Sequence, residues 1–205
     1  MSEHPPDGPT VLVVDDEADV AELYAYRLRK EYTVRQANSG EAALDAFDET
    51  VDVVLLDRRM PGMTGDEVLD RIRDTDHDTR AVMVTAVDPD VEIIDMPFDD
   101  YLCKPIGRDA LIEAVEQQLT AQAYSETMQE LVRATSKKGV LEAELPADEL
   151  ADSDEYQTLE ARIDELRAHN SELLDELDDY EAAFNAVEHS APELGSGSTS
   201  QEASF

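Results

Sequence analysis

The chain of 205 residues carries 50 acidic and 16 basic residues, a formal net charge of −34, and 41% of its residues are hydrophobic. An acidic surface repels phosphate backbones and anionic lipids, which argues against general binding to nucleic acid or membranes, while the hydrophobic fraction excludes disorder throughout. Because the acidic excess runs through the whole chain and only four of the basic residues are lysines, we expect a halophilic protein adapted to near-molar salt; the alternative is an ordinary acidic protein.

The single cysteine, Cys103, excludes an internal disulfide framework and fits a reducing cytoplasm. No apolar run approaches the about 18 residues that a membrane span requires, and the polar, proline-rich residues 1–9 do not form a signal peptide. We therefore expect a soluble, cytoplasmic protein with no membrane contact and a disordered N-terminus over residues 1–9. Cys103 falls on an expected buried strand, where a small core residue is a simpler interpretation than a redox thiol.

Over residues 10–123, short apolar runs alternate with amphipathic segments of helical spacing. The runs predict strands at Val11–Val14, Thr33–Ala37, Val51–Leu56, Ala81–Val84 and Asp100–Cys103. The segments predict helices at Ala18–Lys30, Gly40–Phe47, Gly65–Arg73 and Asp109–Gln122. This alternation is typical of an α/β domain in which helices cover both faces of a five-stranded parallel sheet.

Residues whose side chains can bind ions or take part in reactions come directly after these strands. Asp15 and Asp16 come after the first strand, Asp57 after the third, Thr85 after the fourth and Lys104 after the fifth. Since the carboxyl ends of parallel strands share one edge of the sheet, we expect these side chains to meet there. Clustered carboxylates suit Mg²⁺, which leaves positions for phosphoryl oxygens that a lysine and a threonine can neutralise and orient. A central carboxylate can then act as the nucleophile and form an aspartyl-phosphate.

Four segments, in this order along the chain, resemble the receiver domain of two-component response regulators: VLVVDDE, VDVVLLDRRMPGMTGDEVL, VMVTA and DDYLCKP. The resemblance implies a doubly wound, flavodoxin-like receiver domain, which we assign to residues 10–123. It identifies Asp57 as the phosphoacceptor. It also implies an Mg²⁺ site made by Asp16, Asp57, the backbone carbonyl of Arg59 and, through water, Asp15.

The resemblance further implies that Thr85 and Lys104 sense the phosphoryl group and that Tyr101 changes rotamer when the threonine moves. A histidine kinase would donate the phosphoryl group, and Mg²⁺ would be the cofactor. The domain would not be an enzyme beyond catalysing its own phosphorylation and dephosphorylation. The sequence departs from the family in one place, since only 18 residues separate Thr85 from Lys104. The loss falls in the fourth helix, reduced to Pro89–Met96, which normally helps to form the output face.

After about residue 124 the strand patterns disappear. We expect a helix over Ser125–Leu145, with Gly139 as a point of interruption, then a breaker-rich connection at Pro146–Ser153 and a longer helix over Asp154–Val187. The Ser/Gly-rich residues 188–205 are expected to be disordered. The segments ATSKKGVLEAEL and DSDEYQTLEARIDEL resemble the HalX module appended to receivers in halophilic archaea, which implies a HalX-like helical module over residues 124–187.

The longer helix carries an apolar stripe with a heptad repeat. Positions a are Tyr156, Ile163, Asn170, Leu177 and Phe184, and positions d are Leu159, Leu166, Leu173 and Tyr180. Leucine at d and one asparagine at a favour a parallel two-stranded coiled coil, so one expectation is a homodimer through Ile163, Leu166, Asn170, Leu173 and Leu177. The other is an antiparallel hairpin with Ser125–Leu145 of the same chain, which Leu174 at position e favours by widening the stripe. The pattern leaves both arrangements open.

The charge of the C-terminal region favours protein contacts over direct DNA binding. Residues 125–205 hold 21 acidic and 5 basic residues, so DNA reading would depend on Arg133, Lys137 and Lys138. The resulting hypothesis is a response regulator whose phosphorylated receiver acts through a helical module, with transcription regulation as output and the transcription machinery as partner. One alternative is a signalling adaptor that binds another protein. Another, an aspartyl-phosphate phosphatase, is disfavoured because Arg59 stands where that family has its second aspartate.

Overall fold

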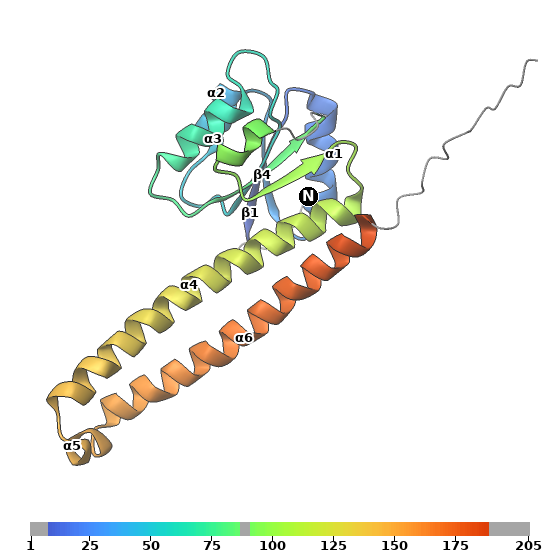
Figure 1. Cartoon of the computed structure of the whole chain (residues 1–205). Helices are drawn as coiled ribbons and strands as arrows, with labels where there is room; N and C mark the ends of the chain where they lie inside the picture. The colour runs from blue at the N-terminus through green and yellow to red at the C-terminus, as the bar shows by residue number, and fades with distance from the viewer. Residues whose placement is uncertain (1–7, 87–90, 189–205) are drawn as a thin grey trace, which may run out of the picture.

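A computed structural model describes residues 8–86 and 91–188, and within them a parallel sheet carries a long helical hairpin (Figure 1). The sheet has five strands in the order β2-β1-β3-β4-β5, and every neighbouring pair is parallel. The strands are β1 (Thr10–Val14), β2 (Thr33–Ala37), β3 (Val53–Leu56), β4 (Arg80–Thr85) and β5 (Asp100–Cys103). The strand order is that of flavodoxin-like doubly wound folds, so the predicted fold class is confirmed.

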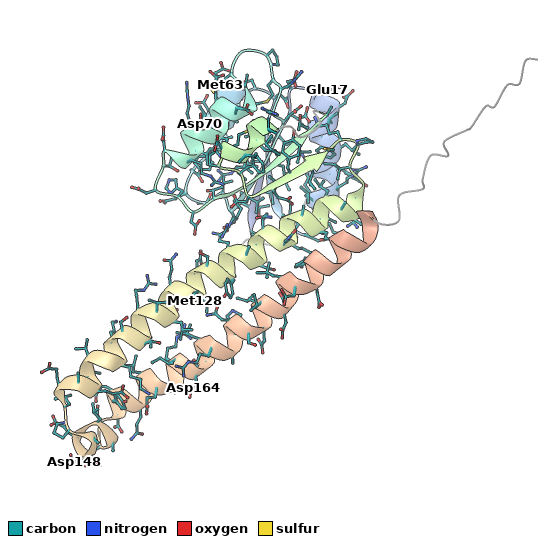
Figure 2. All side chains as sticks on the ribbon, in the orientation of Figure 1. Glu17, Met63, Asp70, Met128, Asp148 and Asp164 are labelled. Carbon is teal, nitrogen blue, oxygen red and sulfur yellow. The ribbon has the colours of Figure 1, made fainter. Side chains whose placement is uncertain are left out.

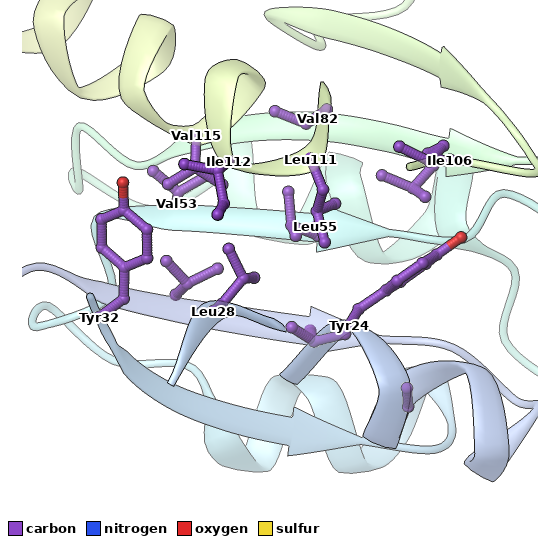
Figure 3. Close-up of a cluster of buried hydrophobic side chains, with 14 residues drawn as sticks. Tyr24, Leu28, Tyr32, Val53, Leu55, Val82, Ile106, Leu111, Ile112 and Val115 are labelled. Carbon is purple, nitrogen blue, oxygen red and sulfur yellow. The ribbon is translucent and has the colours of Figure 1, made fainter. Parts of the chain in front are cut away.

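Helices cover both faces of the sheet because alternate strand residues point to opposite sides. Val11 and Val13 of β1 pack into a cluster with α1 (Ala18–Leu28) and the first turns of α4 (Arg108–Glu144), the cluster drawn in Figure 3. Leu12 and Val14 face the other way, toward α2 (Gly40–Ala46) and α3 (Gly65–Arg73). The central strands are therefore buried on both faces, as their continuous apolar runs predicted.

The fourth connection of the sheet contains only a short 3-10 helix, η1 (Val91–Asp95). The prediction of a reduced fourth helix at Pro89–Met96 falls partly outside the described residues, which resume at Val91. Val91 and Ile94 are exposed on this short element. The predicted disorder of residues 1–9 and 188–205 likewise falls almost entirely outside the described residues.

The two helices predicted on either side of residue 124 form one helix, α4, which has 37 residues. Its first 31 residues, Arg108 to Lys138, contain no glycine or proline, so nothing in the sequence ends the helix where the domain boundary was expected. Gly139 does not interrupt it either. After a short helix, α5 (Ala147–Ala151), the chain turns back into α6 (Asp154–Glu188). The hydroxyl of Ser153 accepts a hydrogen bond from the backbone of Tyr156 and caps the first turn of α6.

Helix α6 packs antiparallel on α4 of the same chain (Figure 1). Lys138 Nζ lies 2.6 Å from Glu160, Arg162 Nε lies 3.0 Å from Glu130, and the Tyr156 hydroxyl donates to Glu142 at 2.9 Å. The hairpin, one of the two arrangements that the heptads left open, is thus the one observed. The stripe side chains that were expected to form a dimer are buried inside it, apart from the partly buried Leu177: Ile163, Leu166, Asn170 and Leu173.

Two smaller predictions are wrong. Leu174 does not widen the packed stripe of α6, because its side chain is 45% exposed. Cys103 is also exposed rather than part of the core. It ends β5, an edge strand with β4 as its single neighbour, so less of the surrounding structure covers it. No helix among the described residues has the length and apolarity to span a membrane.

Candidate functional site

The carboxyl ends of β1 and β3 bring three aspartates together. The backbone N–H of Asp57 donates to the carbonyl of Val14 at 2.9 Å, which continues the ladder between the two strands up to their last residues. Oxygen atoms of Asp15, Asp16 and Asp57 all lie within 4.8 Å of one another. Asp15 and Asp57 are buried, whereas Asp16 is exposed to solvent. Glu17 and Met63, labelled in Figure 2, lie on the loops that follow β1 and β3 and mark this edge of the sheet.

Lys104, which follows β5, bridges two of these carboxylates. Its Nζ donates to Asp15 Oδ2 at 2.6 Å and to Asp57 Oδ2 at 2.8 Å. Burial alone would lower the pKa of Lys104, but the hydrogen bonds to both aspartates and their charges outweigh burial and raise it. The ammonium is therefore held in its charged form between the two carboxylates.

Asp15 is the most deeply enclosed member of the group, with 1% of its surface exposed. Burial raises the pKa of its carboxyl, although hydrogen bonds from Lys104 and from the backbone N–H of Glu17 act in the opposite direction. One ammonium faces three carboxylates here, which leaves an excess of negative charge. A group of clustered carboxylate oxygens with this excess charge fits a hard divalent cation.

The loop after β3 holds Asp57 from its backbone side. The N–H of Arg59 donates to Asp57 Oδ1 at 3.3 Å. Gly62 has a φ of 80°, a left-handed conformation that favours glycine and lets the loop turn tightly. Gly65 opens α3, as the predicted helix Gly65–Arg73 requires, and a Cβ there would come within 2.1 Å of the carbonyl oxygen of Asp57. Only glycine lets α3 start this close to the aspartate.

Thr85 comes from β4, the neighbour of β3, and Tyr101 from β5, the next strand beyond it. Thr85 ends β4 and is buried, and its carbonyl accepts the backbone N–H of Lys104 at 2.8 Å. Tyr101 is partly buried on β5, with its ring centroid 5.6 Å from that of Phe98. The predicted residues Asp15, Asp16, Asp57, Thr85 and Lys104 therefore all stand at one edge of the sheet. The stripe residues of α6 do not belong to this site, since they lie inside the hairpin.

Arg58 is a contributor that the sequence patterns did not reveal. Its guanidinium pairs with Asp66 in the first turn of α3 at 3.2 Å and also interacts with the side chain of Tyr101. It thus links the loop that carries Asp57 to the tyrosine on β5. The sequence spacing of the three residues does not predict this contact, because Tyr101 lies 43 positions after Arg58 in the chain.

Comparison with known families finds two matches along the chain. The family model described as "Response regulator receiver domain" matches residues 11–116, and the model described as "HalX domain" matches residues 120–187. Over 161 residues, 78% of the chain, the sequence is 42% identical to a protein of Haloferax volcanii named "Putative transcriptional regulator". The match covers 28% of that relative, so the chain spans little more than a quarter of its length.

Solved structures resemble the first half of the chain. A signal receiver domain from Vibrio parahaemolyticus is 27% identical with a TM-score of 0.54, over 58% of this chain and 96% of that one. The BeF3-activated receiver domain of DrrB, a Thermotoga maritima protein, is 25% identical with a TM-score of 0.52, over 55% of this chain and 98% of that one. Both similarities fall on the sheet and its helices, the part that carries the aspartate group.

Proposed function

The chain belongs to the response regulator receiver family, with a HalX domain after the receiver, and on this premise we propose that Asp57 accepts a phosphoryl group and that the helical hairpin passes the signal on. Proteins of this family are phosphoacceptors rather than classical enzymes, and a receiver domain implies a cognate histidine kinase. The observation that carries the proposal is the placement of Asp57 beside both the Lys104 ammonium and the two other aspartates.

Asp57 acts in this proposal as a nucleophile. One of its carboxylate oxygens attacks the phosphorus atom of a phosphohistidine, the new P–O bond forms, and the P–N bond breaks with its electron pair staying on the imidazole. The Arg59 N–H already holds Oδ1 at 3.3 Å, so the backbone orients the carboxylate before the reaction. Gly65 supports the same orientation by allowing α3 to pack against the backbone of Asp57.

A Mg²⁺ ion fits this site because the three aspartates offer only hard oxygen ligands and carry excess negative charge. We propose that Asp16 and Asp57 hold it directly, Asp15 through water, and the carbonyl of Arg59 as a further ligand. When bound, the ion supplies charge neutralisation on the phosphoryl oxygens.

Lys104 and Thr85 are proposed to detect the phosphoryl group. Lys104 donates hydrogen bonds to Asp15 and Asp57 in this structure. A phosphoryl group on Asp57 would give the ammonium a new anionic partner. Thr85, buried at the end of β4, would turn its hydroxyl toward the same group. Tyr101 would follow it, and the contact with Arg58 would then have to change.

The hairpin is the proposed output element, because α4 is continuous from the receiver core to the hairpin tip. The helix starts four residues after Lys104, and Leu111, Ile112 and Val115 are buried against the sheet. Where α6 returns toward the receiver, the side chain of Tyr180 interacts with that of Thr120 on α4. Any shift of the β5–α4 connection would therefore move both helices.

We further propose that the output reaches transcription through protein contacts. The Haloferax relative's name supports the link to transcription, and the 21 acidic against 5 basic residues after residue 124 support contacts with protein rather than DNA. An adaptor role that bypasses transcription is the second candidate, favoured by the same charge. Self-association through Ile163, Leu166, Asn170, Leu173 and Leu177 would require the hairpin to open, so we propose the closed hairpin for the free chain.

Phosphorylation of the intact chain tests the proposal directly. Incubation with a small phosphoryl donor such as acetyl phosphate and Mg²⁺ should add one phosphoryl group, observed by mass spectrometry, and peptide mapping should assign it to Asp57. Protein without any such adduct, or with the adduct on another residue, would refute the assignment.

A further inference from the structure

The outer side of α4, beyond the receiver, carries an apolar surface that no described residue covers. Val132 and Val140 are 58% and 63% exposed. Two shallow hollows lie along it: one of about 310 Å³ is lined by Met128, Gln129, Val132 and Arg133. The other, of about 500 Å³, is lined by Ser136, Lys137, Val140, Leu141 and Leu159. We call this stretch, Met128–Leu141, the outer face of α4 (Figure 2 labels Met128 on it).

This outer face continues the side of α4 that packs on the receiver. Leu111, Gln118, Ser125 and Val132 follow one another at seven-residue spacing and therefore lie along one side of the helix. Leu111 and Gln118 are buried under the receiver, whereas Val132 lies beyond it. Helix α6 packs on another side of α4 through Leu131 and Ala134, and its Leu159 reaches the edge of the second hollow. The outer face is thus the solvent-exposed continuation of the side of α4 that is buried against the receiver.

The charges on the outer face are unusual for so acidic a chain. The other three basic residues after residue 124 pair with carboxylates: Lys138 with Glu160, Arg162 with Glu130 and Arg167 with Asp164. Arg133 and Lys137 make no hydrogen bond or ion pair with any residue that the structure describes. One of them lines each hollow. At longer range the charge of Arg133 still acts on Glu130, whose pKa is lowered first by the hydrogen bond from Arg162 and then by the charges of Arg162 and Arg133.

We propose that the outer face of α4 binds an acidic amphipathic helix of a partner protein. Met128–Leu141 spans about 20 Å along the helix, enough for about four turns of a partner whose apolar side chains enter the two hollows. Acidic residues beside that apolar stripe would pair with Arg133 and Lys137. At high salt the apolar contacts would supply most of the affinity, and the two cations would select the partner by charge.

The same charges argue against two other occupants. A second copy of the chain, pairing α4 with α4 about Ser136, would bring Arg133 and Lys137 of the two copies together in either helix orientation. A DNA duplex would meet two cations in a chain with a net charge of −34. The inference names the class of partner for the proposed output hairpin, and it rests on the proposed function only for that role.

The test is a binding assay on the full chain with a defined probe. The probe is a labelled synthetic helix of about 20 residues, with leucines at i, i+3, i+4 and i+7 and glutamates beside them. Fluorescence anisotropy at about 0.5 M KCl should show saturable binding. The double variant Arg133→Glu/Lys137→Glu should bind about tenfold more weakly, and a probe with lysines in place of glutamates should bind that variant best. Val132→Ser/Val140→Ser should also weaken binding of the acidic probe.

Controls separate this inference from the proposed function. Arg167→Glu, a charge reversal on α6, should bind the acidic probe as the wild type does. Arg133→Glu/Lys137→Glu should still be phosphorylated by acetyl phosphate, so loss of phosphorylation and loss of probe binding are distinct results. Absence of probe binding, or equal binding by the double variant, overturns the inference. So does stronger binding of a labelled DNA duplex, or a chain dimer in sedimentation that Val132→Ser/Val140→Ser dissociates.

Discussion

The ammonium of Lys104 lies 2.8 Å from the carboxylate of Asp57, although the two residues are 47 positions apart in the chain. The same ammonium also contacts Asp15 at 2.6 Å. It therefore neutralises the group of aspartates before any phosphoryl group arrives. In the proposed mechanism the proton count of Lys104 does not change on phosphorylation; only its acceptor does.

Asp57→Asn should abolish phosphorylation by acetyl phosphate, because the amide removes the nucleophilic oxygen. Asp45→Asn, a change of an exposed carboxylate on α2, is the matched control and should be modified as the wild type is. Mass spectrometry of the intact protein measures both. Equal modification of Asp57→Asn and the wild type would contradict the assignment of the phosphoacceptor.

Mg²⁺ should raise the melting temperature of the wild type at constant KCl, since an ion that binds only the folded state stabilises it. In Asp16→Asn the exposed ligand loses its charge, and we expect Mg²⁺ to bind about tenfold more weakly. Asp19→Asn, on the exposed side of α1, serves as the control. Identical Mg²⁺ titrations for Asp16→Asn and the control would exclude Asp16 as a ligand.

Asp15→Asn should stabilise the fold at neutral pH. Burial raises the pKa of Asp15 above its unfolded value of 3.8, so the folded state binds the proton more tightly. The stability linked to this group is fully present below the unfolded pKa and is lost as pH rises through the folded pKa. The gain in melting temperature from Asp15→Asn should therefore shrink as the pH is lowered from 7 toward about 4. A gain in melting temperature that grows on acidification would contradict a raised pKa for Asp15.

Asn170→Leu should stabilise the hairpin. Asn170 is 5% exposed, and both polar atoms of its amide lack a hydrogen-bond partner among the described residues. An unsatisfied buried amide costs about 1–3 kcal/mol, so we expect the melting temperature to rise by several degrees. The exposed neighbour Ser171 provides the control Ser171→Leu. In sedimentation the variant should remain a monomer; a change of oligomeric state would favour the coiled coil, in which Asn170 pairs across the dimer axis.

Salt should stabilise the whole chain. With a net charge of −34, unscreened repulsion opposes the folded state in dilute buffer, and added KCl shortens the range of that repulsion. The melting temperature should rise between about 0.1 M and about 2 M KCl. A melting temperature that stays flat or falls across this range would argue against adaptation to high salt.

The site residues at the strand ends were predictable because each directly follows its strand in the sequence. Asp15 and Asp57 each follow a short apolar run, and parallel strands necessarily bring such residues to one edge. The contact between Arg58 and Tyr101 depends instead on how two side chains cross between neighbouring loops, and no spacing rule describes it. The exposure of Cys103 followed from an edge position that the strand pattern alone did not distinguish.

In the hairpin, too, some features were predictable from the sequence and others were not. Its two long helices were predictable from their periodicity, but the continuity of α4 past residue 124 was not, because the expected domain boundary suggested an end that the residues there do not encode. The heptads of α6 identified the residues that are buried, while the identity of the covering helix depended on contacts such as Arg162 with Glu130.

The unbroken length of α4 makes the hairpin a mechanical lever. About 22 residues of the helix extend past the receiver-packed turns, which corresponds to about 33 Å at 1.5 Å per residue. A tilt of about 10° where Leu111 and Val115 meet the sheet, about 45 Å from the end of α4, would displace the tip at α5 by about 8 Å, with no bending of the helix. Small displacements near Lys104 would thus become larger displacements at the tip of the hairpin.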